Sequence, residues 1–325
     1  MIKKLHFYIS HTHDPHRNLA IEKVLFDTVD TETVLLYLWQ NQNTVVIGKN
    51  QNAFSECRTE LLREEGGTLA RRLSGGGAVF HDLGNLNFTF ICTTENLDVP
   101  KNMEVIRAAC RLAGIETELS GRNDVLADGR KFSGNAFYNS RGHSYHHGTL
   151  LIRADMEKLG RYLTPPKAKL ESKGVKSVRS RVINLSELSE GLSCDLMQSH
   201  LISAAESVFG LPAQELNTID REQVTALAAY FADEEFLYGS PIPFNISCEG
   251  RLPFGGAELK LCVTNGCITD LTLYTDALDS DLPTTVKKAL LSLPFELSAI
   301  RAALHGALSH ADANALLSLL SDQIF

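Results

Sequence analysis

The spacing of apolar residues along the chain predicts helices that alternate with groups of short strands. Asp14 and Pro15 mark a helix start, because aspartate can cap the first turn and proline suits the first helical position. Apolar residues then recur at helical spacing from Leu19 to Leu25. Further helices are predicted for residues 55–65, 102–113 and 193–209.

Short apolar runs predict strands that come mostly in neighbouring pairs. The segments VLLYLW (34–39) and TVVIG (44–48) flank the turn QNQN, and AVF (78–80) precedes LNFTFI (86–91); HGTLLI (147–152) adds one more strand. Paired strands with helices between the groups favour an α+β fold with mixed or antiparallel sheets over a doubly wound parallel sheet.

The pattern changes after the polar, proline-containing stretch GSPIPF (239–244). Apolar and polar residues alternate from Ala257 to Val263, Asn265-Gly266 supplies a two-residue hairpin turn, and residues 267–275 return as the partner strand. Two or three amphipathic helices complete the chain. We therefore expect two domains, a larger one over residues 1–246 and a small α+β domain over residues 247–325.

Composition narrows the class of protein. The chain has 325 residues, and 31 Lys and Arg against 39 Asp and Glu give a net charge of −8, which argues against nucleic-acid binding. The seven cysteines are scattered, which favours reduced thiols in a cytoplasmic protein. No signal peptide and no apolar run of membrane-spanning length occurs, so we expect no membrane insertion; we also expect a monomer.

Three consecutive glycines, Gly75, Gly76 and Gly77, follow two arginines in the segment ARRLSGGGAVFHDLGN (70–85). Glycine adopts positive φ readily and leaves main-chain N–H groups uncovered, so this run could form a nest for an anion such as phosphate. It matches neither a Walker loop nor a dinucleotide fingerprint. The alternative is a flexible hairpin loop beside a solvated arginine pair.

Lys131 follows an Asp-Gly turn in the segment GRNDVLADGRKFSGNAF (121–137), which also contains Asp124. A lysine that faces a cleft here could stabilise negative charge developing on a phosphate or a carboxylate. The alternative is a solvated hairpin residue. A hydrolase built on Lys131 and Ser133 is also conceivable from the spacing, but no nucleophile elbow and no third member accompany the pair.

Two further segments carry ionisable residues. Residues 167–181 contain one acid, Glu171, and six cations: Lys167, Lys169, Lys173, Lys176, Arg179 and Arg181. Such a basic loop could close over an anionic intermediate or meet an acidic partner, or it could be only a solvated loop. His143, His146 and His147 allow a zinc site, but adjacent residues of a strand point to opposite faces, which argues against it.

Together and in this order, these segments resemble those of bacterial lipoate–protein ligases of the A type. The resemblance runs the length of the chain. It rests on DPHRNLAIEKVLF, LWQNQNTVVIGKNQNAFSEC, ARRLSGGGAVFHDLGN, SGRND, GRKFSGNAF, HHGTLL and KGVKSVRSRVINL, and on FGGAELKL and YTDAL beyond the expected domain boundary.

The resemblance implies a biotin/lipoyl-ligase fold, with a large α+β catalytic domain and a small C-terminal domain that moves over it. It implies a reaction in two steps, in which lipoate and Mg·ATP (hence ATP and Mg²⁺) give lipoyl-AMP and pyrophosphate, and the lipoyl group then passes to one lysine of an acceptor. The implied acceptors are acidic lipoyl-domain proteins, namely E2 subunits of 2-oxoacid dehydrogenases and the glycine-cleavage H protein.

The resemblance also implies roles for individual residues. Lys131 matches the family's lysine that contacts both the lipoyl carbonyl and the phosphate, and is the expected catalytic residue. The residues expected to bind ATP or the adenylate are Arg72, Gly77, Ala78, Val79, Phe80, Lys131, Asn85, Asp124, Arg141 and His147, and those expected to bind lipoate are Lys131, Ser74, Gly76 and Gly77. Lys173, Lys176, Arg179 and Arg181 are expected to cover the adenylate, and Val45, Phe88 and Leu150 to line an apolar tunnel for the lipoyl tail.

Relatives with the same fold leave other functions open. Octanoyl or lipoyl transferases work through a cysteine thioester, but no cysteine lies between Cys110 and Cys194, and Cys92 ends a predicted strand. Biotin–protein ligases have a different arginine pattern around the glycine-rich loop. A non-catalytic carrier-binding relative is the remaining alternative, which the presence of Arg72, the glycine run and Lys131 argues against.

Overall fold

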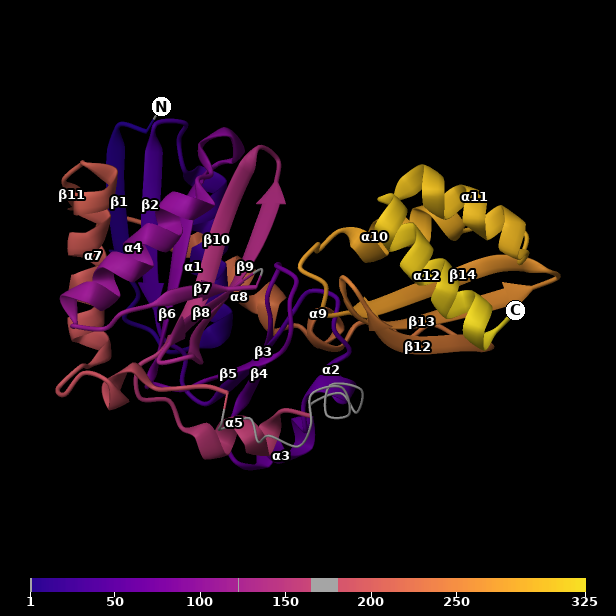
Figure 1. Cartoon of the computed structure of the whole chain (residues 1–325), viewed down its shortest axis with the longest axis horizontal. Coiled ribbons are helices and arrows are strands. Elements are labelled where there is room, and N and C mark those ends of the chain that lie inside the picture. The colour runs from indigo at the N-terminus through magenta and orange to yellow at the C-terminus, as the bar shows by residue number, and fades with distance from the viewer. Residues whose placement is uncertain (1, 122, 165–180) are drawn as a thin grey trace.

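The chain folds into two units that lie side by side (Figure 1). The structure, a computed structural model, describes residues 2–121, 123–164 and 181–325. The N-terminal unit contains the elements up to residue 238, and the C-terminal unit begins with the strand that starts at Ile246.

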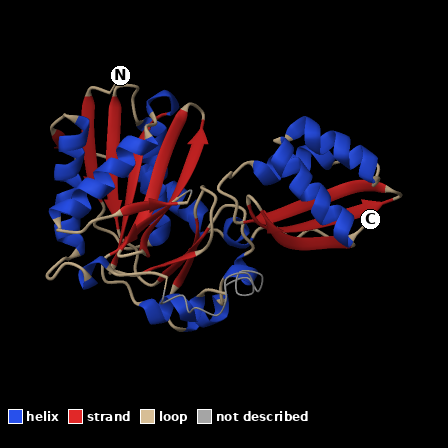
Figure 2. Ribbon diagram, in the orientation of Figure 1, coloured by secondary structure: helices blue, strands red, loops and turns tan. Residues whose placement is uncertain are grey.

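An eight-stranded sheet forms the centre of the N-terminal unit (Figure 2). Its strands in spatial order are β11 (Ala213–Glu215), β1 (Lys4–Ile9), β2 (Thr33–Trp39), β6 (Asn85–Thr93), β10 (His143–Leu151), β9 (Arg130–Ser140), β8 (Asp124–Ala127) and β7 (Glu118–Ser120). The pairs β11–β1 and β1–β2 are parallel and the pairs from β2 to β7 are antiparallel, so the sheet is mixed, which confirms the expected class.

Helices cover both faces of this sheet. On one face α4 (Val99–Leu112) and α7 (Cys194–Phe209) pack against alternate strand residues such as Leu36 and Leu38. On the other face α1 (Pro15–Thr28) and α8 (Arg221–Ala232) pack against Leu35 and the residues that follow it at every second position. Because both faces are covered, all of β2 and β6 is buried.

A smaller three-stranded sheet lies beside the large one and carries the glycine-rich loop. Its order is β4–β3–β5, with β3 (Thr44–Ile47) in the middle, β4 (Thr68–Arg71) parallel to it and β5 (Val79–His81) antiparallel to it. The short helices around it are α2 (Ala53–Glu56), α3 (Thr59–Glu64), α5 (Met156–Tyr162) and α9 (Glu234–Tyr238). The connecting 3₁₀ helices are η1 (Thr94–Asn96) and η3 (Leu185–Glu187).

The C-terminal unit has its own sheet and its own core. Strands β12 (Ile246–Leu252), β13 (Gly255–Thr264) and β14 (Cys267–Thr275) form an antiparallel meander, and α10 (Leu282–Leu290), α11 (Leu297–Ala307) and α12 (His310–Gln323) cover one face of it. The turn between β13 and β14 is Asn265-Gly266, with φ of 53° and 76°, as the sequence predicts.

Polar contacts join the two units along one edge. The side chain of Asn50 donates to the carbonyl oxygen of Ser280 at 2.9 Å, and its own carbonyl oxygen accepts from the N–H of Thr275 at 3.0 Å. Lys49 forms an ion pair of 3.0 Å with Asp281. These contacts place the loop after β14 directly against the segment between β3 and α2.

Features that a few adjacent residues determine are confirmed more often than the pairing of strands. The side chain of Asp14 accepts from the N–H of Arg17, as a cap should. The helix predicted over 55–65 is instead split into α2 and α3, and β2 and β3 belong to different sheets rather than to one hairpin. Among the described residues, no helix is long and apolar enough to cross a membrane.

Candidate active site

A cavity of about 530 Å³ opens between the large sheet, the glycine-rich loop and the C-terminal unit. Its apolar and aromatic lining includes Leu19, Trp39, Val46, Val79, Ala136, Phe254 and Leu278. Its polar lining includes Arg72, His81, Asn87, Asn123, Asp124, Lys131, His147, Arg251 and Asp276. A concave site with an apolar part and a few convergent polar groups is the usual form of a small-molecule pocket.

The floor of the cavity is one face of the large sheet. Trp39, Asn87 and Thr149 lie opposite one another across β2, β6 and β10, so their side chains share a face. The expected tunnel residues are one position away: Val45, Phe88 and Leu150 are instead fully buried in the core, with relative accessibilities of 0%. That prediction is wrong because adjacent strand residues point to opposite faces, and the cavity takes Val46, Asn87 and Thr149.

Arg72 holds the shape of the glycine-rich loop. Its guanidinium is buried and donates to the carbonyl oxygens of Gly75 and Gly77, both at 2.8 Å, to that of Val46 at 3.2 Å and to the Ser74 hydroxyl at 3.1 Å. Burial lowers the pKa of Arg72 to about 10, which leaves it protonated near neutral pH. Most donors of Arg72 are therefore used within the protein, although its side chain also lines the cavity.

Arg71 fixes the segment after β3 in the same way. Its buried guanidinium donates to the carbonyl oxygens of Gln51 at 2.7 Å, Lys49 at 3.0 Å and Gly48 at 3.2 Å, and to that of Leu237 at 3.1 Å. Burial lowers the pKa of Arg71 to about 10. The arginine pair therefore organises two loops by binding main-chain carbonyls, where the sequence suggested free charge beside an anion nest.

The glycine run meets the C-terminal unit. Gly76 has a φ of +91°, a conformation that few other residues adopt, and its N–H donates to the carbonyl oxygen of Ala277 at 3.0 Å. A Cβ atom on Gly75 would lie only 2.2 Å from the same oxygen. The expected anion nest is thus engaged, at Gly76, by a carbonyl group of the C-terminal unit.

Lys131 enters the cavity from β9. Its ammonium group forms an ion pair of 2.6 Å with Asp124 of the neighbouring strand, and 38% of each side chain is exposed. Gly134 leaves room for it, since a Cβ atom there would lie 3.0 Å from Nζ. The backbone of Lys131 pairs with residues 181–183: its N–H donates to Arg181 at 2.9 Å, and its carbonyl accepts from Ile183 at 3.0 Å.

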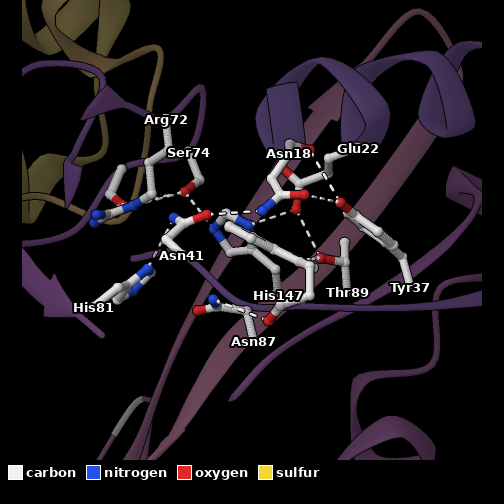
Figure 3. Close-up of polar contacts among 12 residues, drawn as sticks. Asn18, Glu22, Tyr37, Asn41, Arg72, Ser74, His81, Asn87, Thr89 and His147 are labelled. Atoms are coloured by element: carbon white, nitrogen blue, oxygen red, sulfur yellow. Dashed lines mark hydrogen bonds and ion pairs between the residues drawn. The ribbon is translucent and has the colours of Figure 1, made fainter. Parts of the chain in front are cut away.

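A buried chain of hydrogen bonds runs from helix α1 to the glycine-rich loop (Figure 3). Glu22 Oε1 lies 2.9 Å from His147 Nδ1 and accepts from the Thr89 hydroxyl at 2.7 Å. His147 Nε2 lies 2.7 Å from the Ser74 hydroxyl. With Nδ1–H donating to Glu22, Nε2 accepts from Ser74. Ser74 is fully buried, so this array positions the loop rather than exposing a nucleophile.

The neighbouring histidines point to opposite faces of β10, as the sequence predicts. His146 faces away from the cavity, donates to Asn135 Oδ1 at 2.8 Å and stacks on Phe137. Burial lowers the pKa of His146 to about 3. Within the described parts of the chain, no three His, Cys, Asp or Glu side chains are grouped as a metal site would need.

Other expected site residues lie apart from Lys131. Phe80 is buried in the core beside the small sheet, and Asn85 is a buried residue of β6 that donates to Asn87 Oδ1 at 3.1 Å. Arg141 is exposed in the turn between β9 and β10, at the far end of the hairpin from Lys131 and roughly 30 Å along the strand. Lys173, Lys176 and Arg179 lie outside the described residues.

Two polar residues of α1 at the site were missed by the sequence reasoning. Asn18 and Glu22 are 0% and 2% exposed, and Asn18 donates to Asn41 Oδ1 at 2.9 Å, which in turn leads to His81 (Figure 3). The available signal was their spacing: two polar residues four apart lie among the apolar residues of a buried helix face. Such residues need partners inside the protein.

Comparisons with known proteins identify the family of this chain. Residues 14–206 match the lipoyl protein ligase A/B catalytic domain, and residues 242–320 match the bacterial lipoate protein ligase C-terminus. The chain is 39% identical to the lipoate-protein ligase A of Bdellovibrio bacteriovorus over 316 residues, which cover 93% of this chain and 92% of that protein.

Two solved structures share the architecture. LipL1 of P. falciparum in complex with lipoate superposes with a TM-score of 0.86 at 27% identity, over 98% of this chain and 100% of that one. The bipartite lipoate protein ligase of Thermoplasma acidophilum, described together with its E2 lipoyl domain, gives a TM-score of 0.65 at 25% identity, over 76% of this chain and 100% of that one. By both of its matched domains and by its full-length relatives, this chain belongs to the lipoate-protein ligase A family.

Proposed function

We propose that the protein is an ATP-dependent lipoate–protein ligase that activates lipoate as lipoyl-AMP and transfers the lipoyl group to a lysine of an acceptor protein. The observation that carries the proposal is the composition of the cavity. One wall holds Leu19, Trp39 and Val46, which suit an apolar tail, and another holds Lys131 beside the glycine-rich loop, which suits a carboxylate and a phosphate.

The first step joins the two substrates. A carboxylate oxygen of lipoate attacks the α-phosphorus of ATP, the bond to the β-phosphate breaks, and pyrophosphate leaves with the electron pair. Lys131 is placed to hold the carboxylate near the α-phosphate and to neutralise charge in the transition state. For this it must exchange its present partner, Asp124, for the substrate oxygens.

The second step releases AMP. The acceptor lysine attacks the carbonyl carbon of the mixed anhydride, the bond to the phosphate oxygen breaks, and the amine loses a proton. Exclusion of water matters here, because the anhydride is also open to hydrolysis. The cavity wall contributed by Pro253, Phe254 and Leu278 of the C-terminal unit supports that exclusion.

The loop residues have supporting roles in this proposal. Gly76, Gly77, Ala78 and Val79 line the cavity, and the last three would contact the substrates through the main chain, with the loop shaped by Arg72 and by the Ser74–His147 hydrogen bond. Mg²⁺ would arrive with ATP and reduce the charge of its phosphates. Asp124, a carboxylate among the described lining residues, offers oxygen ligands of the kind that suit that ion.

We further propose lipoyl-domain proteins, E2 subunits and H protein, as acceptors, and a boundary between catalytic and accessory domains at residues 246 and 247. The acceptor proposal is supported by family membership and by the E2 lipoyl domain described with the T. acidophilum ligase. The boundary is supported to within one residue by the separate sheet and core that begin at Ile246.

Exchange of label between pyrophosphate and ATP tests the proposal directly. The purified protein is incubated with lipoate, octanoate or biotin and no acceptor. We expect exchange with lipoate, and the rate with octanoate relative to lipoate measures how strictly the apolar wall selects the tail. Absence of exchange with every acid would overturn the ligase proposal and favour a transferase or carrier-binding relative.

A further inference from the structure

The cavity has few cations that are able to meet an anionic substrate. Among the described lining residues, the lysine and arginine side chains are Arg72, Lys131 and Arg251. Arg72 donates to main-chain carbonyls and to the Ser74 hydroxyl, so most of its hydrogen-bond donors are already used. Lys131 and Arg251 remain, and they come from different units of the chain.

Arg251 is held at the cavity wall by the end of the neighbouring hairpin. It lies one residue before the end of β12, and its guanidinium forms an ion pair of 3.0 Å with Asp276, while 44% of its side chain is exposed. Asp276 also accepts from the N–H of Gly256 at 2.6 Å, which fixes the carboxylate. Gly255 permits this approach, since a Cβ atom there would lie 2.5 Å from Asp276 Oδ1.

The C-terminal unit is anchored where Arg251 reaches the cavity. Ala277, the residue after Asp276, accepts the N–H of Gly76 in the glycine-rich loop at 3.0 Å. The position of Arg251 relative to the loop is therefore set through two short links, from Arg251 to Asp276 and from Ala277 to Gly76.

The two available cations have the same kind of environment. Lys131 is paired with Asp124 and Arg251 with Asp276, and all four side chains line the cavity. An incoming polyphosphate can replace these carboxylates, because it offers several charged oxygens to each cation. Arginine suits this exchange, since its planar guanidinium binds two phosphate oxygens at once.

We propose that Arg251 binds the β- and γ-phosphates of ATP during adenylate formation, so that the C-terminal unit supplies a cation to the first half-reaction. The inference rests on the proposed function. Lys131 serves the carboxylate and the α-phosphate, and Arg251 meets the charge that passes to pyrophosphate when the bond between the α-phosphorus and the bridging oxygen breaks. The second half-reaction contains no pyrophosphate, so Arg251 has no ligand in it.

The test compares Arg251→Met with Arg301→Met, which removes an exposed arginine from α11 in the same unit. We expect Arg251→Met to raise the KM for ATP by about ten- to hundredfold, because a charge-assisted contact is lost. The Kd for Mg·ATP, measured by calorimetry, should rise by the same factor. The KM for lipoate, and the rate of transfer from synthetic lipoyl-AMP to an acceptor domain, should stay within about twofold. Arg301→Met should match the wild type throughout.

Asp276→Asn distinguishes substrate binding by Arg251 from a purely structural role of its ion pair. It breaks the same pair but keeps the guanidinium, so we expect a much smaller effect on ATP than with Arg251→Met. Equal losses in both variants, extending to the transfer step, would overturn the inference. If wild-type protein shows no lipoate-dependent exchange, the proposed function fails and the inference with it; if wild type exchanges and Arg251→Met keeps a normal KM for ATP, only the inference fails.

Discussion

The N–H of Gly76 donates a hydrogen bond of 3.0 Å to the carbonyl oxygen of Ala277, although the two residues are 201 positions apart in the chain. The bond joins the glycine-rich loop of the N-terminal unit to the segment that follows β14. It is supported by the contacts of Asn50 with Ser280 and Thr275. The arrangement of the two units therefore depends on how closely the segment after β14 can approach this loop.

Gly75→Ala should separate the two units without unfolding either. The new Cβ atom would lie 2.2 Å from the carbonyl oxygen of Ala277 and 2.7 Å from that of Leu278, so main chain must shift. We expect a larger radius of gyration by small-angle X-ray scattering. Gly77→Ala is the matched control, because a Cβ atom there meets nothing within 4 Å among the described residues. Identical scattering from both variants and wild type would contradict the prediction.

How far the sequence predicts this molecule depends on how local each signal is. Asp14 caps α1 and Asn265-Gly266 turns the last hairpin because both features are set by a few adjacent residues. The tunnel residues were assigned to the wrong strand face, since β2, β3 and β6 are buried on both sides and their apolar runs do not indicate which side holds the cavity.

Local and non-local signals differ in the same way at the site. Lys131 and the glycine run were found because their motifs are contiguous in the chain. The hydrogen bonds of Arg72 to main-chain carbonyls were not predicted, because no sequence pattern displays partners of that kind. Glu22 and His147 are 125 residues apart, and only the packing of α1 on β10 brings them together.

Lys131→Ala should abolish adenylate formation while the protein remains folded. The residue is half-buried and its loss leaves only the partly exposed Asp124 without its ion pair, so the effect on stability should be small. Pyrophosphate exchange measures the activity and circular dichroism the fold. Arg130→Ala, which removes the preceding cation of β9, should retain activity; a Lys131→Ala rate within tenfold of wild type would exclude the proposed role.

Glu22→Ala should lower the free energy of unfolding by about 3 kcal/mol or more. Glu22 is 2% exposed, and its loss leaves His147 Nδ1 and the Thr89 hydroxyl without the acceptor they share. Glu22→Gln keeps an acceptor oxygen and should cost clearly less. Urea unfolding of the two variants gives the comparison, and equal stabilities would mean that the array does not support the fold.

Cysteine chemistry should not contribute to the reaction. Burial raises the pKa of Cys92 to about 11 and that of Cys57 and Cys110 to about 12, so these thiols are protonated at neutral pH. No cysteine is among the described residues that line the cavity. We expect Cys92→Ser to transfer the lipoyl group within twofold of the wild-type rate. A transfer rate lower by a hundredfold or more would support the alternative of a transferase that works through a cysteine thioester.

Two buried histidines should make the protein sensitive to mild acid. Burial lowers the pKa of His81 and of His146 from 6.5 to about 3, and the charge of Arg72 contributes at His81. Below about pH 6.5 the two histidines of the unfolded chain therefore bind protons that they do not bind in the folded state. The stability that the neutral rings provide is therefore complete above that pH and declines as the pH falls towards 3.

The expected decline is about 2 kcal/mol per histidine between pH 7 and pH 5, from the linkage of proton uptake to unfolding. Urea unfolding at pH 7, 6 and 5 measures it. His146→Gln is the informative variant, since its amide can still donate to Asn135 Oδ1, as His146 does now, but it does not titrate. It should lose about half of the acid sensitivity of the wild type, and an unchanged pH dependence would show that His146 accepts a proton within the fold.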